Sequence, residues 1–475
     1  MIAQHILGLS GLLAATLFIF GLKQMSSPTT ALSGIVVAGV GMVIAVLASF
    51  LAVFDLPEAV GPHLTTNLSL AVVGLLVGGG GAWWRSRTVP MTAMPQMVAL
   101  FNGMGGGAAA AIAAVELSVH EAPSVVLLTM TVAGGLIGSI SLTGSLIAWA
   151  KLDGRIEKPW RYAAQRAING LLFVATVALG VAVVARYGGP NDVVVLLAGL
   201  FFLGALLFGV MMTLPIGGAD MPVVISLYNA FTGLAVGLEG FALQNPALMI
   251  AGMVVGSAGT LLTVLMAKAM NRSLANVLFS NFGDAAATGT ASIHGQMKSI
   301  DAADAAVSMR YASSVIVIPG YGLAVAQAQQ KLYEFVKVLQ AAGVDVKFAI
   351  HPVAGRMPGH MDVLLAEAGV PYDLIHDMDD INGDFANTDV ALVIGANDVV
   401  NPAARTDKSS PIYGMPILNA DQAHQVYVVK RGQGKGYSGV ENELFYDGNC
   451  SMVYGDAQAV LTQMVQAAKD LALAA

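Results

Sequence analysis

The chain has 475 residues, of which 56% are hydrophobic and only 11% are charged, whereas a soluble protein carries roughly 25% charged residues. Its mean hydropathy is +0.70, which excludes most of the chain from the class of soluble globular proteins. The net charge is −7 and the chain has no run rich in Lys and Arg, so nothing in the sequence predicts a basic surface that would bind nucleic acid. One cysteine, Cys450, cannot build a disulfide framework or a cysteine zinc site, and we predict no metal site.

Nine apolar runs precede residue 270, and each has the roughly 20 residues that a bilayer crossing needs. They lie near residues 2–22, 32–54, 64–84, 95–117, 124–149, 166–186, 193–213, 222–243 and 246–267. Basic residues follow the first, third, fifth and ninth runs, and Lys and Arg accumulate in cytoplasmic loops. We therefore expect residues 1–270 to form a membrane domain with its N-terminus outside, followed by a cytoplasmic domain.

Glycine is abundant in these runs, notably at Gly78 to Gly81 and Gly105 to Gly107. Small residues let transmembrane backbones approach closely. Both glycine runs are thus expected to pack against neighbouring helices.

A short repeat places two asparagines in equivalent positions. Met94-Pro95 is followed by Asn102 and Met221-Pro222 by Asn229, in each case seven residues beyond the proline. At about 1.5 Å per residue both amides lie ~10 Å inside the cytoplasmic ends of their helices. Polar groups at such depth often line a water or ion path. Alternatively, the two asparagines are relics of a duplication and only bond neighbouring helices.

Few acids accompany these amides in the membrane domain. Asp220 precedes the eighth run at the inner surface, while Glu116 and Glu239 lie toward the outer ends of the fourth and eighth runs. Amides, water and acids spread across the bilayer in this way are compatible with a proton path.

The remaining chain alternates between strand and helix patterns. Residues 271–307 are predicted to be a linker with a connecting helix, and residues 308–475 a separate domain. Strands are expected at 314–318, 344–351, 373–378, 391–396, 417–419 and 425–431, with helices at 323–342 and 456–473. This alternation predicts an α/β, Rossmann-like, doubly wound parallel sheet.

A glycine turn joins the first of these strands to its helix. Gly320, Gly322 and Val325 make a GxGxxV pattern, in which glycines allow a tight turn and let a pyrophosphate approach backbone N–H groups. The strand before it and the helix after it favour dinucleotide binding.

The choice of dinucleotide depends on the ribose. NAD sites usually end the second strand with an acid, but here that strand ends at His351. A basic, glycine-rich loop that begins with Lys430 and Arg431 and includes Gly436 leaves the last strand instead, and could enclose a phosphate. These features favour NADP(H).

Two further loops follow strand ends, where ligands bind in such sheets. The first runs from His351 to His360 and contains Arg356, which could pair with a pyrophosphate. The second runs from Gly395 to Pro402 and contains Asp398. At the switch point between the strands at 314–318 and 391–396, Asp398 would lie beside the nicotinamide and could sense its redox state or a proton, although helix capping is a commoner use of aspartate.

Several of these motifs, in this order, closely resemble the β subunit of the proton-translocating NAD(P) transhydrogenase of bacteria. The resemblance covers essentially the whole chain. It rests on segments 217–224, 268–273, 319–322, 350–360 and 393–398.

The resemblance implies an enzyme that transfers hydride reversibly between NAD(H) and NADP(H), with Re/Si specificity, while a proton crosses the bacterial inner membrane. NADP(H) would bind to residues 308–475, and NAD(H) to an α subunit of one or two chains that adds membrane helices. It further implies a dimer of αβ units in membrane lipid. Asp398, Asn229, Asp220 and Asn102 would then serve coupling and the proton path. The cofactor-binding residues would be Gly320, Tyr321, Gly322, Val325, Ala326, Val353, Ala354, Gly355, Arg356, Gly395, Ala396, Asn397, Asp398, Lys430, Arg431, Gly432, Gly436 and Tyr437.

Two positions depart from the family pattern, in which many members carry His at the position of Asn102 and Ser at that of Gly432. Because an amide does not titrate usefully, we expect either water held by Asn102 and Asn229 to carry the proton, or the partner subunit to supply the titrating group. Another function class, a channel or carrier whose Rossmann domain only senses a nucleotide, is an alternative.

Overall fold

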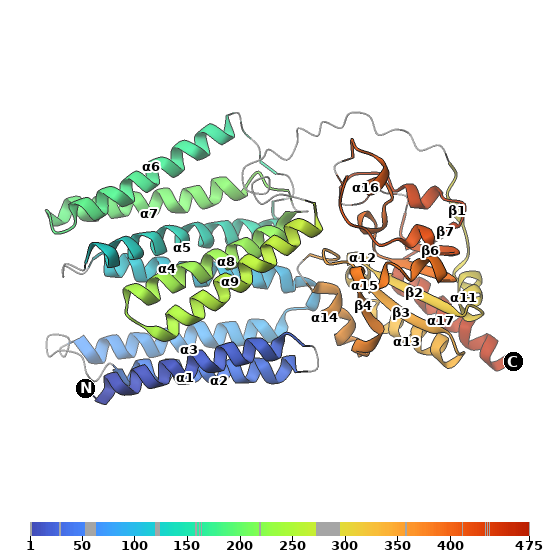
Figure 1. Cartoon of the computed structure of the whole chain (residues 1–475), viewed down its shortest axis with the longest axis horizontal. Helices are drawn as coiled ribbons and strands as arrows, with labels where there is room; N and C mark the ends of the chain where they lie inside the picture. Colours follow the sequence, from blue (N-terminus) through green and yellow to red (C-terminus); the bar gives the residue numbers. More distant parts are fainter. Residues whose placement is uncertain are drawn as a thin grey trace. The chain divides into compact units, whose positions relative to one another are not determined.

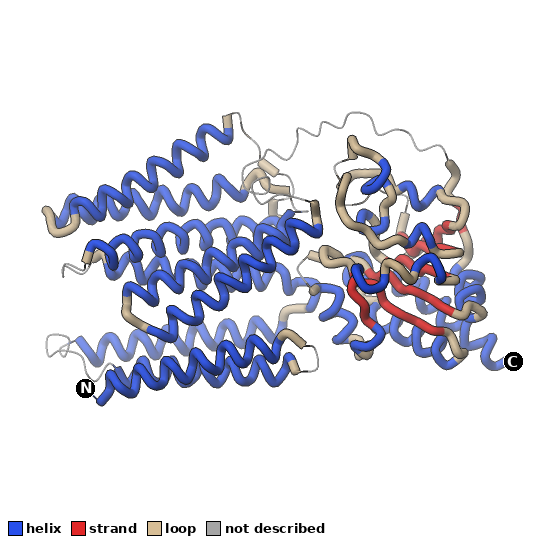
Figure 2. The backbone as a smooth tube through the Cα atoms, viewed as in Figure 1, coloured by secondary structure: helices blue, strands red, loops and turns tan. Residues whose placement is uncertain are grey.

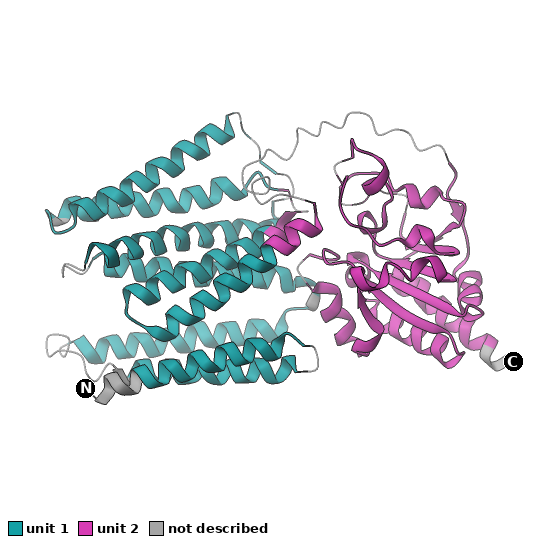
Figure 3. Cartoon of the chain, viewed as in Figure 1, with its two compact units in different colours: residues 1–216, 224–263 teal, residues 217–223, 264–475 magenta. Residues whose placement is uncertain are grey.

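The computed structural model describes the chain except for residues 1, 28–29, 53–62, 119–123, 157–158, 161, 163, 218–219, 272–294, 357–358, 411, 433, 435, 437 and 475. Side chains are in addition left out at residues 2–7, 51–52, 91, 191 and 472–474. The chain forms two compact units, residues 1–216 with 224–263, and residues 217–223 with 264–475 (Figure 3). The first unit is helical, and the second contains every described strand (Figure 2).

Within the described residues, nine helices are long and apolar enough to cross a membrane, which confirms the predicted runs. They are α1 (Ile2–Met25), α2 (Ala31–Ala52), α3 (Leu64–Thr88), α4 (Met94–Glu116), α5 (Val125–Leu152), α6 (Gln165–Arg186), α7 (Asn191–Thr213), α8 (Met221–Ala242) and α9 (Pro246–Ala269) (Figure 1). Pro95 and Pro222 lie in the first turns of α4 and α8, where a missing N–H costs no intrahelical bond.

Glycines bring several of these helices together. A Cβ on Gly106 of α4 would lie 2.9 Å from the carbonyl oxygen of Gly138 on α5, and a Cβ on Gly233 of α8 would overlap the backbone of Gly256 on α9. The expected packing role is thus confirmed for the glycines of α4. At Gly78 to Gly81 of α3 an added Cβ would meet no described residue within 4 Å, so these glycines pack against no helix in the described part of this chain.

The second unit is built on a seven-stranded sheet whose strands are all parallel. The strands are β1 (Lys298–Ser299), β2 (Ser314–Pro319), β3 (Asp345–Ile350), β4 (Ile375–Asp377), β5 (Val390–Ile394), β6 (Gln425–Lys430) and β7 (Cys450–Tyr454). Their order is β1-β7-β6-β5-β2-β3-β4. From β2 to β7 this is the order of a doubly wound dinucleotide-binding sheet, so the predicted fold class is confirmed.

Three details of the sequence prediction need correction. Residues 417–419 are not a strand, while β1 and β7 were not expected. The helix expected at 323–342 is two helices, α12 (Tyr321–Val325) and α13 (Gln329–Ala341), and Gln327 between them has a φ of 50°. A left-handed residue interrupts the regular helix.

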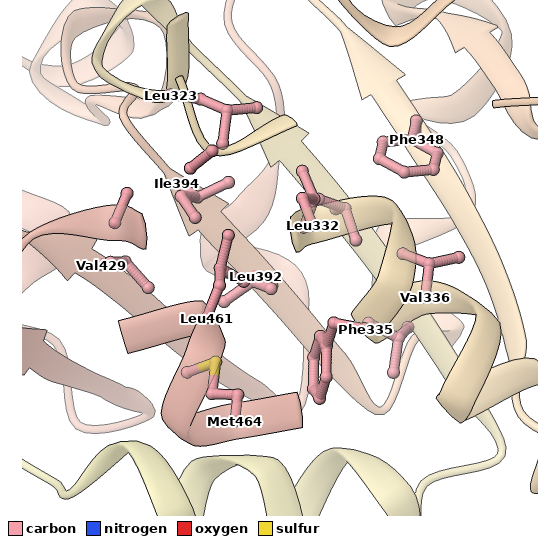
Figure 4. Packing of buried hydrophobic residues seen from close by; sticks show 14 of the residues in the cluster. Leu323, Leu332, Phe335, Val336, Phe348, Leu392, Ile394, Val429, Leu461 and Met464 are labelled. Atoms are coloured by element: carbon pink, nitrogen blue, oxygen red, sulfur yellow. The ribbon is translucent and has the colours of Figure 1, made fainter. Parts of the chain in front are cut away.

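The core of the sheet unit lies on both faces, because successive residues of a strand point to opposite sides. Val315 and Val317 of β2 contact one buried cluster, and Ile316 and Ile318 contact the other. Figure 4 shows the first cluster, in which side chains of α13 and α17 (Ala457–Ala474) cover the strands. Burial on both faces explains why the interior of β2, Val315 to Ile318, is entirely apolar.

Helix α11 (Ala302–Arg310) and strand β1 lie inside the range that the sequence assigned to the linker. β1 pairs with β7, and Met309 of α11 is fully buried in the first cluster. The folded domain therefore includes residues from Lys298 onward.

Candidate functional site

The carboxyl ends of β2 and β5 meet where the strand order reverses. β2 pairs with β5 on one side and with β3 on the other, and β6 lies beyond β5. The connections that leave β2 and β5 therefore diverge, and ligands of such sheets bind in the crevice between them. The predicted switch point between these two strands is confirmed.

The glycine turn after β2 packs directly on the residues after β5. The N–H of Gly320 donates to the carbonyl of Ile394, and that of Gly322 to the carbonyl of Gly395, each over 2.9 Å. A Cβ on either glycine would overlap the backbone of Gly395 or Ala396. In this structure the two N–H groups thus join the turns, in contrast to the expectation that they face a pyrophosphate.

Tyr321, Arg356 and His360 form a cluster beside this turn. The Arg356 guanidinium lies 4.3 Å from the centroid of the Tyr321 ring, and the Tyr321 and His360 ring centroids are 5.9 Å apart. The backbone N–H of Arg356 donates to Nδ1 of His360 over 3.1 Å. Burial, followed by the charge of Arg356, lowers the pKa of His360. The charged guanidinium of Arg356 therefore lies next to the glycine turn.

His351 fixes the start of the loop that carries Arg356. Its Nε2 lies 2.8 Å from the carbonyl oxygen of Pro416, and its Nδ1 accepts from the N–H of Val353 over 3.2 Å. The proton of the neutral ring must then sit on Nε2. Burial lowers the pKa of His351 to about 4, which keeps the ring neutral. Val353, Ala354 and Gly355 follow directly, and Gly355 has a φ of 108° that favours glycine.

Asp398 is joined to the loop that follows β6. Its two carboxyl oxygens accept from the N–H and the hydroxyl of Ser438, each over 2.8 Å. Gly436 packs against the same carboxylate so closely that a Cβ there would overlap it. The neighbouring Asn397 accepts from the side chain of Asn442 through its carbonyl and amide oxygens. Asp398 thus accepts hydrogen bonds from a loop, and caps no helix with them.

Lys430 lies at the end of β6, on the same edge of the sheet. Its ammonium is 4.7 Å from the centroid of the Phe445 ring and donates to the carbonyl of Gly434. Burial lowers the pKa of Lys430, and the charge of Asp398 opposes this shift. Lys430 and Asp398 are therefore close enough to interact electrostatically.

The remaining predicted cofactor residues contribute less to this edge. Arg431 and Gly432 are exposed. Val325, at the third position of the glycine pattern, is 43% exposed, so it does not take the packing role of the usual glycine. Ala326 is half-buried. Tyr437 lies outside the described residues.

These residues fit a phosphorylated dinucleotide in two respects. Lys430 at the end of β6 and Arg356 in the loop after β3 supply cations, which suits phosphate groups. His360 is 2% exposed, yet its Nε2 has no hydrogen-bond partner among the described residues, so a buried polar atom remains available to a ligand.

A second polar cluster lies inside the membrane unit. The side-chain amide of Asn102 on α4 donates to the hydroxyl of Ser145 on α5 over 3.0 Å, and the backbone carbonyl of Asn102 accepts from the hydroxyl of Thr232 on α8 over 3.3 Å. The hydroxyls of Thr232 and Ser141 are 2.6 Å apart, and Ser141 also donates to the carbonyl of Tyr228. We call these five residues the polar cluster. It links three helices through amide and hydroxyl groups.

The other two residues predicted for the proton path are not joined to this cluster by any described hydrogen bond. Asn229 is half-buried on α8, and its side-chain amide makes no hydrogen bond to a described residue. Asp220 precedes α8 and is 4% exposed. Asn102 thus bonds neighbouring helices, as the alternative interpretation of the repeat required, whereas Asn229 does not.

Sequence reasoning missed Ser438, Asn442 and the hydroxyls of the polar cluster. Ser438 is 40 residues from Asp398, and no local pattern connects two positions so far apart. The hydroxyls recur along α5 at Ser141 and Ser145, a spacing of four that places both on one helix face. That spacing was a usable signal.

Comparison with known proteins agrees with this architecture. The family model described as NAD(P) transhydrogenase beta subunit matches residues 8–467. A protein of Rhodospirillum rubrum named NAD(P) transhydrogenase subunit beta is 44% identical over 468 residues, which is 96% of this chain and 97% of the relative. The protein of the same name from a defined strain of that organism gives the same values. The chain therefore belongs to the NAD(P) transhydrogenase beta subunit family.

Proposed function

We propose that this chain transfers hydride, with Re/Si specificity, between NADP(H) bound by its own residues 308–475 and NAD(H) bound by an α subunit. The transfer is coupled to a proton that crosses the membrane. The observation that carries the proposal is that Arg356, Asp398 and Lys430 all lie at or after the carboxyl ends of strands of one parallel sheet, in a chain of this family.

Bound NADP(H) supplies or accepts the hydride, and the chain binds and orients it. Arg356 pairs with the pyrophosphate, and Lys430 with Arg431 pairs with the 2′-phosphate, because cations form strong charge-assisted bonds to phosphate. Tyr321 and the glycine turn contact the dinucleotide. Positioning and electrostatics are the protein's share of such a reaction.

Coupling to the membrane requires two states of the nucleotide domain, one open to exchange and one closed for hydride transfer. The hydrogen bonds between Asp398 and Ser438 hold the glycine-rich loop from Gly432 to Gly439, which we propose as a lid over the nucleotide. A change in the charge around Asp398 would loosen that loop and alter how tightly the nucleotide is held.

The membrane domain at residues 1–270 supplies the proton path, with Asn102, Asn229 and Asp220 along it. We infer that the chain lies in the lipid of a bacterial inner membrane, with its N-terminus outside and its sheet domain in the cytoplasm. Two αβ units form a dimer, and the α subunit, of one or two chains, contributes further membrane helices.

The 2′-phosphate assignment is tested with Lys430→Ala, assayed with the α subunit present. Loss of one charge-assisted bond costs about 1.5–3 kcal/mol, so NADPH affinity should fall roughly 10- to 100-fold while NADH affinity at the α subunit stays constant. Lys337→Ala, an exposed lysine on α13, is the matched control. Unchanged NADPH affinity in Lys430→Ala would refute the assignment.

The reaction itself is tested by NADH-dependent reduction of an NADP analogue by the purified complex. Hydride transfer supports the proposal. Nucleotide binding without hydride transfer would refute it and favour a channel or carrier with a sensing domain.

A further inference from the structure

Glu239 of α8 is a buried acid to which the proposed function assigns no role. Its side chain is 1% exposed, and neither carboxyl oxygen has a hydrogen-bond partner among the described residues. Such a group is costly in a membrane helix, because an ionised carboxylate without a partner loses its hydration. An acid kept at that cost marks a functional position more often than a structural one.

The packing around Glu239 leaves room for its carboxyl group. Gly134 of α5 lies so close that a Cβ there would overlap Oε1 of Glu239. Any residue other than glycine at position 134 would displace the carboxyl group. The site is therefore formed by two helices, with the acid on one and the space on the other.

The charged surroundings of Glu239 are sparse. Glu116, the half-buried last residue of α4, acts on it electrostatically. The charged residues of α5 and α9 are Lys151 and Lys268, in the last turns of those helices. Among the described residues, Glu239 forms no ion pair. Without an ion-pair partner among the described residues, the neutral acid has a lower free energy in this position than the carboxylate.

Glu239 lies on the same face of α8 as the polar cluster. Tyr228, Thr232 and Glu239 are spaced by four and seven residues, which keeps them in line on a helix. Their neighbours on α5 run in the opposite direction: Gly144 packs on the Tyr228 ring, Ser141 on Thr232 and Gly134 on Glu239. At about 1.5 Å per residue, Glu239 lies ~10 Å beyond Thr232 along the α5–α8 interface.

We propose that Glu239 is the group that binds and releases the proton in the membrane domain, a role that rests on the proposed function. Hydroxyl and amide groups of the polar cluster can relay a proton, but they cannot hold one. A carboxyl group can hold a proton, whereas the amide of Asn102 cannot. The proton leaves the neutral acid for water, crosses ~10 Å through about three waters in line, and reaches Thr232. A proton from the opposite side of the membrane then protonates the carboxylate again.

The first test measures proton movement in vesicles that contain the complete complex, driven by hydride transfer. Glu239→Gln should lower the pumping rate at least about tenfold, because proton transfer by a positioned group contributes that much or more. Glu239→Asp keeps the carboxyl group and should retain most of the pumping. Asp192→Asn, an exposed acid in the first turn of α7, is the matched control and should pump normally. Pumping at the wild-type rate in Glu239→Gln would overturn the proposal.

The second test uses the wild-type complex, so it does not depend on the folding of a variant. A hydrophobic carbodiimide reacts with neutral carboxyl groups in apolar surroundings, and peptide mass spectrometry should find it on Glu239, with pumping lost in proportion. Full labelling of Glu239 with pumping intact would refute its role, as would an unlabelled Glu239 in complexes that the reagent has inhibited. Absence of hydride transfer in the untreated complex would instead refute the proposed function.

Discussion

The contact between Ser438 and Asp398 gives a direct test of how the loop after β6 is held. In Ser438→Ala, the hydroxyl that donates to Asp398 over 2.8 Å and accepts from the N–H of Val440 over 3.2 Å is removed. The backbone N–H of residue 438 still donates to the other carboxyl oxygen. The substitution therefore weakens the attachment of the loop without abolishing it.

The size of the effect follows from the two lost bonds. A hydrogen bond to a charged acceptor contributes about 1.5–3 kcal/mol and a neutral one about 0.5–1.5 kcal/mol. Because Ser438 is half-buried, the lower ends of both ranges apply, and their sum is about 2 kcal/mol. That free energy corresponds to a roughly 30-fold larger equilibrium constant for local opening.

Amide hydrogen exchange of the full chain in detergent measures this opening. The amides of Gly439, which donates to the carbonyl of Gly436, and of Val440 should exchange about 30-fold faster in Ser438→Ala, while the amides of β5 keep their protection. Ser438→Thr retains a hydroxyl and serves as the control. Unchanged exchange at Val440 in the alanine variant would refute the role assigned to this contact.

Two further predictions concern the sheet edge. Burial lowers the pKa of His351 from 6.5 to about 4, so between these values the unfolded chain binds a proton that the folded chain does not. The free energy of unfolding should therefore be highest above about pH 6.5 and fall by up to ~3 kcal/mol toward pH 4, which amide exchange in β3 measures. His351→Gln should flatten this pH dependence, and an unaltered slope in that variant would contradict the role of His351. His376→Gln is the control. Gly320→Ala should lower the free energy of unfolding by about 1–3 kcal/mol, since its Cβ would overlap the backbone beside Gly395. Gly383→Ala, where a Cβ meets nothing within 4 Å, is the control, and equal denaturation midpoints for the two alanine variants would contradict the packing argument.

The sequence predicted the membrane unit well because span length and apolar composition are local properties. A run of about 20 apolar residues has few alternatives to a helix in a bilayer. The apolar strand at 314–318 and the glycine turn after it were likewise recognisable, since a doubly wound sheet buries such a strand on both faces.

Short elements at the edge of the sheet could not be predicted in the same way. β7 spans five residues and β1 only two, and each is a strand because a neighbour supplies its hydrogen bonds. Residues 417–419 have an apolar strand-like pattern, yet no strand pairs with them. Pairing partners distant in sequence decide such cases.

The sequence by itself determined which residues enter the membrane, which enter the sheet, and which strand ends carry the polar loops. Hydrophobic periodicity and glycine turns are patterns of neighbouring residues, so they can be recognised without the tertiary structure. Only the tertiary structure decided that the N–H groups of Gly320 and Gly322 donate to residues at and just after the end of β5, that Ser438 donates to Asp398, and that Gly134 makes space for Glu239. Those pairs lie far apart in the chain, and long-range packing alone brings them into contact.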